Sequence, residues 1–341
     1  MKTKTLRKGI NTGVLIAAPK PGDYIAGAVS AVIYTERLKD GQWHNKYRPT
    51  EEKQIGVYFD TMSCVTFAAL NSIEEQVSYL VEKGLLKGDG LQYLKDLGFF
   101  DENGKFNASD RFTAIMSNTT KQGNYLNAVW ESIRVDGLLP EKDLPAKLDD
   151  RTPWEWEDWM DKKVITDELK EKAKKVKNVL QFAYEWVSTD RESLKYHAKQ
   201  APLQIAAPVC SPWNTTEIIK ACSAGAGHST LVDGYIDKKE LKDFDHYNPF
   251  AKRLAWDYKI AAAIKGVVEV NTTKLLNKIS MIIYKEQGKP ALYVAAGDIL
   301  ITFTTTYDTY KKDFESAKII ELAPAEFAKF KVAKAVSIKA N

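Results

Sequence analysis

The chain is poor in the residues and segments that define several large classes of protein. Three cysteines in 341 residues argue against a disulfide scaffold, although a Cys210–Cys222 bridge stays open. No apolar stretch approaches the roughly 20 residues that span a bilayer, and the run 14–18 is too short for a secretory signal. We therefore expect a cytoplasmic chain, or one borne on a particle such as a virion, with no signal peptide and no membrane partner.

A large excess of one charge is also missing. Lysine and arginine number 49, and aspartate and glutamate number 45, which gives a net charge of +4. Nucleic-acid-binding faces need clustered basic residues, whereas the lysine-rich segment 162–177 has acidic residues mixed in, as on a solvated helix face. The CxxC, HExxH and EF-hand patterns and the glycine-rich nucleotide loops are absent. We predict no nucleic-acid partner, no metal and no cofactor.

The pattern of apolar residues divides most of the chain into a helical part and a strand-rich part. A helical period begins at Ser63 and stops at Gly84, and a second helix is predicted over 124–136. The polar stretch 150–200 is predicted to be largely helical. Strands are predicted at 203–209, 228–236, 242–248, 280–284 and 291–303.

These elements predict an α+β fold in three parts. Residues 1–47 are an N-terminal extension that packs on or across the core. Residues 48–267 form the core, with an insertion near 150–190. Residues 268–341 form a small C-terminal α+β domain, and 250–267 are expected to be the connection to it. The total length is ample for two compact domains.

One cysteine occupies a position that matters chemically. In "DTMSCVTFAALNSIEE", Cys64 lies directly at the predicted start of a helix. A helix N-terminus and a neighbouring imidazolium both stabilise a thiolate, the nucleophilic form of cysteine. Free cysteine is also among the most buried residue types. Position alone leaves a nucleophile and a core residue equally open.

His228 is the best candidate for a base that would serve this thiol. In "SAGAGHSTLVDGY" it lies between a loop of small residues and a strand. Gly225 and Gly227 leave room for a substrate, and the strand fixes the imidazole. His246 competes for the role, but alternation along a strand would turn it away from the face that Asp245 presents.

An imidazole base usually needs a third group that fixes its tautomer. Asp245 follows His228 by 17 residues, on the partner strand of the predicted hairpin, so the two side chains could meet across the ladder. Asn248 is the second choice. Asp245 could equally be a solvated hairpin residue.

The order of cysteine, helix, distant histidine strand and acid resembles that of papain-like cysteine peptidases, in a divergent prokaryotic or phage form. "MSCVTFAALNSIEE" looks like the nucleophile segment of that family, with Phe67 three positions after the cysteine. "GHSTLVDGY" and "DFDHY" resemble the histidine strand and the segment of the orienting residue, and 109–145 resembles the cleft-lining portion. The resemblance covers residues 48–260.

The resemblance implies a helical half that carries Cys64 and an antiparallel half that carries His228 and Asp245, with no cofactor. It implies a substrate cleft lined by Gly123, Asn124 and Gly227.

The family places an oxyanion glutamine shortly before the cysteine. The nearest here is Gln54, ten residues upstream, which requires the intervening residues to form a loop. Asp60 is interpreted as a helix N-terminal cap. Thr61 and Val65 depart from the family signature around the cysteine.

The resemblance implies a cysteine peptidase that acts on proteins or peptides through an acyl-enzyme. Two alternatives remain. One is a peptidoglycan-cleaving amidase or endopeptidase with the same three residues. The other is a weakly active or inactive structural component of a phage-like assembly, bound to other proteins. The segment 151–160, with three tryptophans, is expected to pack an inserted helix onto the core rather than to form an aromatic substrate wall.

Overall fold

The computed structural model describes residues 13–16, 19, 36–148, 153–209, 213–220 and 226–271, together with short segments beyond them. It divides into two compact units, Met1–Val270 and Asn271–Asn341. Cys210, Cys222 and Gly225 lie outside the described residues, so the predicted alternatives that involve them do too. No helix of the described part is long and apolar enough to cross a membrane.

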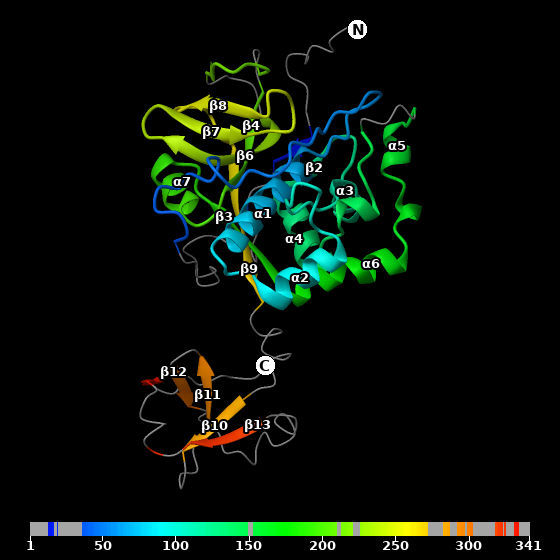
Figure 1. The fold of residues 1–341 in the computed structure, drawn as a ribbon. Coiled ribbons are helices and arrows are strands. Elements are labelled where there is room, and N and C mark those ends of the chain that lie inside the picture. The colour runs from blue at the N-terminus through cyan, green and yellow to red at the C-terminus, as the bar shows by residue number, and fades with distance from the viewer. Residues whose placement is uncertain are drawn as a thin grey trace. The chain divides into compact units, whose positions relative to one another are not determined.

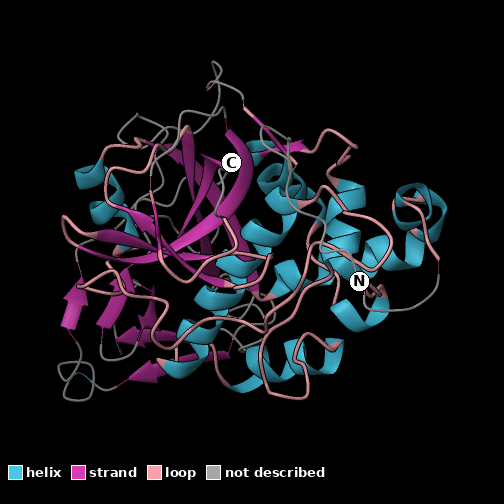
Figure 2. Cartoon of the chain, turned by 90° about the horizontal axis from the view of Figure 1, so that it is seen from above, coloured by secondary structure: helices cyan, strands magenta, loops and turns pink. Residues whose placement is uncertain are grey.

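The first unit separates helices from strands, as Figure 2 shows from above. Its α-helices are α1 (Cys64–Glu82), α2 (Gly88–Leu97), α3 (Asp110–Met116), α4 (Leu126–Asp136), α5 (Trp156–Trp159), α6 (Asp167–Lys174) and α7 (Arg191–Ala198), with 3-10 turns at Glu141–Asp143, Lys162–Val164 and Lys175–Asn178. Its strands are β1 (Val14–Leu15), β2 (Asn124–Tyr125), β3 (Leu180–Val187), β4 (Leu203–Pro208), β5 (Ile218–Ile219), β6 (Ala226–Ile236), β7 (Glu240–Phe244), β8 (Ala251–Ala255) and β9 (Ala262–Val270).

Seven strands form one sheet in the order β3-β9-β4-β6-β7-β8-β5 (Figure 1). All neighbouring pairs are antiparallel except β5 and β8. The predicted α+β class is therefore confirmed. The helices α1 and α4 pack on this sheet, which places the start of α1 against β6.

One prediction of secondary structure was wrong and one was incomplete. Residues 250–267 are not a connection, because β8 and most of β9 lie there, whereas 150–200 contains the helices α5, α6 and α7 as predicted but also β3, an edge strand of the large sheet. Buried charge explains part of the error. Lys252 in β8 and Lys265 in β9 are each 1% exposed, and their ammonium groups contact buried carboxylates. These strands therefore look more polar in sequence than they are in the fold.

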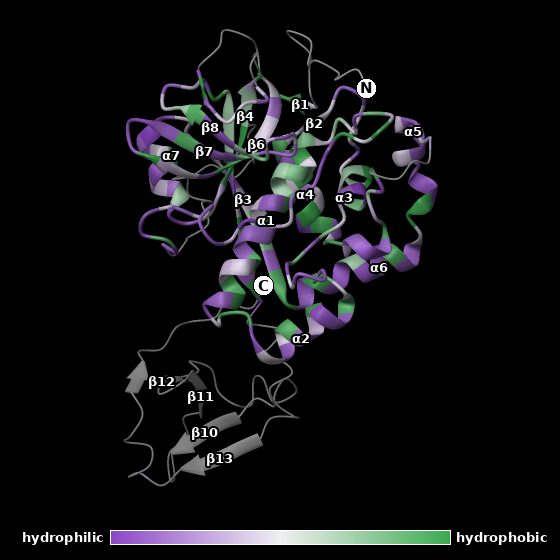
Figure 3. Cartoon of the chain, turned by 45° about the horizontal axis from the view of Figure 1, so that its top comes forward, coloured by the Kyte–Doolittle hydropathy of each residue, from purple (hydrophilic) through white to green (hydrophobic). Residues whose placement is uncertain are grey.

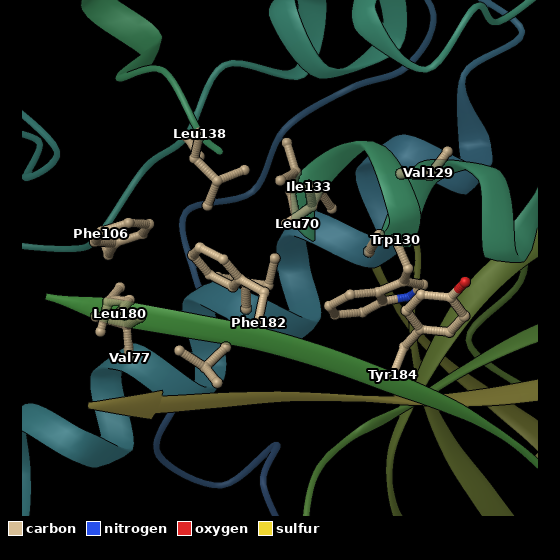
Figure 4. Packing of buried hydrophobic residues seen from close by; sticks show 14 of the residues in the cluster. Leu70, Val77, Phe106, Val129, Trp130, Ile133, Leu138, Leu180, Phe182 and Tyr184 are labelled. Carbon is tan, nitrogen blue, oxygen red and sulfur yellow. The ribbon is translucent and has the colours of Figure 1, made fainter. Parts of the chain in front are cut away.

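The core of this unit lies between α1, α4 and β3. Phe182 and Tyr184 of β3 point toward Trp130 and Ile133 of α4 in Figure 4, with Val77 of α1 close by. Burial of each such side chain contributes about 1.5–3 kcal/mol.

The indole of Trp130 lies directly on the backbone of β9. A Cβ at Gly266 would lie 1.9 Å from its Cη2 atom, so only glycine allows this approach.

One buried amide joins the two halves of the unit. The Gln204 side chain, on β4, is fully buried. Its Nε2 donates to the Val65 carbonyl of α1 at 2.8 Å and to Ser229 Oγ of β6 at 3.0 Å. Its Oε1 accepts from Trp130 Nε1 at 2.7 Å. The first turn of α1 is thereby fixed against the strand that carries His228.

The segment with three tryptophans packs onto the helical side. Trp159 is fully buried, and its Nε1 donates to the Ala146 carbonyl at 3.0 Å. Trp156 Nε1 donates to the Thr61 carbonyl at 2.9 Å. Helix α6, which follows, is mostly hydrophilic in Figure 3, as expected for a helix on the surface. The packing interpretation of this segment agrees with these contacts.

The described residues of the second unit form a separate five-stranded sheet. Its strands are β10 (Ile282–Glu286), β11 (Leu292–Ala296), β12 (Ile299–Thr302), β13 (Lys318–Leu322) and β14 (Lys331–Ala333), in the order β13-β10-β11-β12-β14. The first three of these strands overlap the two strand-like runs of the sequence.

Candidate active site

Cys64 is the first residue of α1 and is fully buried. Its thiol lies near the backbone N–H of Ser229 on β6, the neighbour of His228. Burial raises the pKa of the Cys64 thiol well above its ordinary value; the nearby Ser229 N–H lowers it, and the charges of Asp60 and Asp245 raise it. In this closed arrangement the thiol is held protonated at neutral pH.

His228 and Asp245 form a buried hydrogen-bonded pair. His228 lies on β6 opposite Ala207 of β4, and its Nε2 is 2.7 Å from Asp245 Oδ1. Because the carboxylate can only accept, Nε2 carries the proton and Nδ1 presents a lone pair. Nδ1 has no hydrogen-bond partner among the described residues. The imidazole is thus oriented by the acid and has one nitrogen available for a proton.

Four donors surround the Asp245 carboxylate. Oδ1 accepts from His228 and from the His246 backbone N–H at 2.7 Å. Oδ2 accepts from Trp213 Nε1 at 2.9 Å and lies 3.1 Å from Lys252 Nζ. Burial alone would raise the pKa of Asp245, but the positive charges and hydrogen bonds around it hold that pKa well below its usual range. Asp245 is therefore an ionised carboxylate inside the protein.

The expected orientation of His246 was wrong. The prediction assumed that a strand continues through residue 248, but β7 ends at Phe244, so alternation does not apply. His246 is fully buried, and its ring centroid lies 4.9 Å from that of His228 and 5.4 Å from that of Phe67. Burial lowers the pKa of His246 to about 3, so it is a neutral imidazole beside the pair.

Gln54 lies beside the residues that precede Cys64. A bridge between Ile55 and Asp60 closes a short loop, and the Thr61 N–H donates to the Gln54 carbonyl at 3.2 Å. Gln54 Nε2 donates to Asp60 Oδ1 at 2.8 Å, and this carboxylate also accepts from the Met62 N–H at 2.9 Å.

The Tyr247 hydroxyl donates to the second oxygen of Asp60. The interpretation of Asp60 as the helix cap was wrong, because the cap position is Ser63 and the Asp60 carboxylate is engaged with the amide of Gln54.

The predicted cleft residues Gly123 and Asn124 are covered by the N-terminal strand. β1 pairs in parallel with β2, and the Asn124 N–H donates to the Gly13 carbonyl at 2.9 Å. Gly13 has φ +117°, and a Cβ on it would lie 2.3 Å from the Met62 carbonyl oxygen. Val14 is 3% exposed. Residues 13–15 therefore lie between the loop of Gly123 and the residues just before Cys64.

The side chain of Asn124 and the backbone of Gly227 are both buried and take part in local structure. The Asn124 side chain donates to the Ser117 carbonyl at 3.0 Å and to Thr119 Oγ1 at 3.1 Å, so it holds a loop and only its backbone faces β1. Gly227 is buried in β6 immediately before His228.

Comparisons with solved structures identify the fold of the chain. Xylellain, a cysteine protease from Xylella fastidiosa, matches with a TM-score of 0.51 and 14% identity over 79% of this chain and 99% of its own. The chain has the papain-like cysteine peptidase fold. The bromelain protease from Ananas comosus (TM-score 0.42, 14% identity, 66% of this chain and 97% of that one) and procathepsin L 3 from Tenebrio molitor (0.44, 13%, 76% and 76%) also match. Searches against protein-family models and curated proteins find no match.

Sequence reasoning missed two residues that contact Asp245 in this candidate site, Trp213 and Lys252. Trp213 comes from a segment with no periodicity, so no signal could have placed it. Lys252 carries a usable signal, because it alternates with the buried Phe250 and Leu254 on one strand face. A lysine at such a position predicts a buried acidic partner.

Ligand atoms of His228, Asp245 and His246 lie within 4.8 Å of one another, the one such group among the described residues. Since the Lys252 ammonium already contacts this carboxylate, we interpret the group as part of the Cys–His–Asp arrangement rather than as a metal site.

Proposed function

We propose that the chain is a cysteine peptidase that hydrolyses peptide bonds through Cys64, His228 and Asp245. The observation that carries this proposal is the buried contact between His228 Nε2 and Asp245 Oδ1 at 2.7 Å, on a strand whose next residue, Ser229, has its backbone N–H near the Cys64 thiol. A helix start, an oriented imidazole and an ionised acid converge at one place, which is the arrangement that nucleophilic catalysis by cysteine needs.

In the proposed reaction, His228 Nδ1 takes the proton of Cys64, and the thiolate attacks the carbonyl carbon of the substrate. The negative oxygen of the tetrahedral intermediate accepts from the Cys64 backbone N–H and from the amide of Gln54. His228 then gives its proton to the leaving amine as the C–N bond breaks, and a thioester remains. Water, deprotonated by His228, attacks this thioester and releases the acid and the free thiol.

The covering strand adds a condition to this proposal. A substrate backbone cannot pair with Gly123 and Asn124 while residues 13–15 are paired there. We propose that the N-terminal segment blocks the cleft in this form and that activity requires its displacement.

The direct test is labelling of the full chain by an epoxide reagent for catalytic thiols, with the modified residue identified by mass spectrometry. We expect modification at Cys64 and its loss in Cys64→Ala, while Cys210→Ala remains labelled. Modification at Cys210 or Cys222 instead would contradict the assignment. Release of peptides from casein, compared with turbidity loss on purified cell walls, separates the peptidase from the peptidoglycan-cleaving alternative.

A structural role without catalysis is the second candidate. The full burial of Cys64 and the occupied cleft favour it, because both describe a site closed to substrate. Stable association with other proteins, together with no reaction at Cys64 even after removal of residues 1–16, would support this role.

The place of Gln54 leads to a prediction of its own. Gln54→Ala removes one donor to the oxyanion, so we expect kcat to fall about 10²-fold with little change in KM. Gln92→Ala is the matched control, since Gln92 also donates to an aspartate, at 2.7 Å, but on the exposed face of α2. Steady-state hydrolysis of a peptide substrate measures both. Equal rates for the two variants would exclude Gln54 from the oxyanion site.

A further inference from the structure

We propose that Lys252 is a positioning residue of this site, whose ammonium is the countercharge of Asp245 and sets the pH range in which His228 exchanges protons with Cys64. This inference rests on the proposed function. In this proposal, the positive charge that balances Asp245 is supplied by a lysine side chain.

The contacts of Lys252 are those of a fixed, buried cation. The residue is 1% exposed, and its Nζ lies 3.1 Å from Asp245 Oδ2. The same nitrogen donates to the Tyr247 carbonyl at 2.7 Å and to the Pro249 carbonyl at 2.5 Å. Two hydrogen bonds to carbonyl oxygens and one ion pair with a carboxylate therefore fix the position of the ammonium.

All three of these partners belong to the segment that carries Asp245. Residues 245–249 follow β7 and turn back into β8, where the Asp245 N–H donates to the Phe250 carbonyl at 2.8 Å. Lys252 pairs across the two strands with Asp243, not with Asp245. Its side chain instead contacts both the Asp245 carboxylate and the backbone of the turn at residues 245–249. It therefore holds Asp245 in the position from which it contacts His228.

The charge of Lys252 matters because the site excludes water. Asp245, Lys252 and His228 are all buried, and an uncompensated carboxylate is costly in such surroundings. With Lys252 present, Asp245 and the ammonium sum to zero charge. The Cys64–His228 pair can then pass between its neutral and ionic forms without a net local charge that favours imidazolium or opposes thiolate. The titratable groups that face this pair are Asp245, Lys252, His246, Tyr247, Asp60 and Asp243.

The sign of each substitution follows. Lys252→Met leaves a net negative charge, which favours the protonated forms of both His228 and Cys64, so their titrations move to higher pH. Asp245→Asn leaves a net positive charge, so they move to lower pH. The double variant Asp245→Asn/Lys252→Met has a neutral pair again, so its titrations return toward those of the unmodified chain. Each single shift is expected to be about one pH unit.

The experiment uses the full chain and two readouts that need no substrate. One is the NMR titration of the His228 imidazole, assigned by comparison with His228→Ala. The other is the pH dependence of the rate of Cys64 alkylation by iodoacetamide. Lys242→Met is the matched control: it removes a lysine of β7 whose Nζ pairs with Glu240 at 2.5 Å, and both titrations should stay unchanged.

Opposite shifts in the single variants with recovery in the double variant establish the role of Lys252. Failure of Lys252→Met to fold, with folding restored in the double variant, supports the same charge pairing. Unchanged titrations in Lys252→Met, or no recovery in the double variant, overturn it. A third outcome separates the two proposals. If the His228 titration shifts as expected but Cys64 in the folded chain reacts with iodoacetamide no faster than in the unfolded chain at any pH, the proposed catalytic role of Cys64 is contradicted. The charge pairing of Lys252 with Asp245 is then still supported.

Discussion

Replacing His228 with alanine is expected to lower the rate of peptide hydrolysis by about 10³-fold or more at neutral pH. The thiol of Cys64 has a pKa raised by burial, so without an adjacent base it stays protonated and cannot attack. The same variant should react with iodoacetamide much more slowly than the unmodified chain. Initial rates on a peptide substrate and alkylation rates at the same pH measure the two effects.

His246→Ala is the informative comparison for this variant. His246 touches His228, and neither of its ring nitrogens has a hydrogen-bond partner within the described residues. We expect His246→Ala to retain activity within about tenfold, because packing is lost but no proton carrier is. His44→Ala serves as a second control away from Cys64. If His246→Ala is inactive and His228→Ala is active, the two assignments are reversed.

Removal of residues 1–16 is expected to raise peptide hydrolysis by about 10- to 100-fold. The blocking strand is held by a short pairing with β2 and by burial of Val14, which contributes about 1.5–3 kcal/mol. Each 1.4 kcal/mol corresponds to a tenfold change in the population of the open cleft. The shortened chain should also label faster with the epoxide reagent, measured as a second-order rate constant.

A single substitution in the full chain tests the same idea without truncation. Gly13→Val puts a side chain against the Met62 carbonyl and strains a backbone with φ +117°, so it should release β1 and raise the rate. Gly84→Val is the matched control, since Gly84 has φ +66° and no atom within 4 Å of the added Cβ. Equal activity of Gly13→Val, the shortened chain and the unmodified chain would show that β1 does not limit access.

The local elements were predictable because their signals are local. The apolar period after Ser63 and the stop at Gly84 predicted α1, which runs over Cys64–Glu82. The contact of His228 with Asp245 was also expected, but not the position of Asp245 relative to the strands. Asp245 lies past the end of β7, so the two side chains meet at the mouth of the hairpin rather than across its ladder.

Features that depend on distant parts of the chain could not be predicted. Nothing in the sequence near Gly13 indicates that it pairs beside Asn124, because this contact spans more than a hundred residues. Trp213, which donates to Asp245, comes from an irregular segment. Lys252, which pairs with Asp245, comes from β8, a strand that its polar residues made hard to recognise in the sequence. The alternation of Lys252 with buried residues signals its burial, but which carboxylate it meets depends on the turn at residues 245–249, which only the tertiary structure shows.

The amide of Gln204 has a consequence for how this protein can diverge. Val65, Ser229 and Trp130 all hydrogen-bond to one buried side chain, so the spacing between the helix of Cys64 and the strand of His228 is determined inside the core. The loops around Gly123 and the N-terminal strand lie outside that network. Substitutions in these outer segments can therefore alter access to the site, while the relative position of Cys64 and His228 stays unchanged.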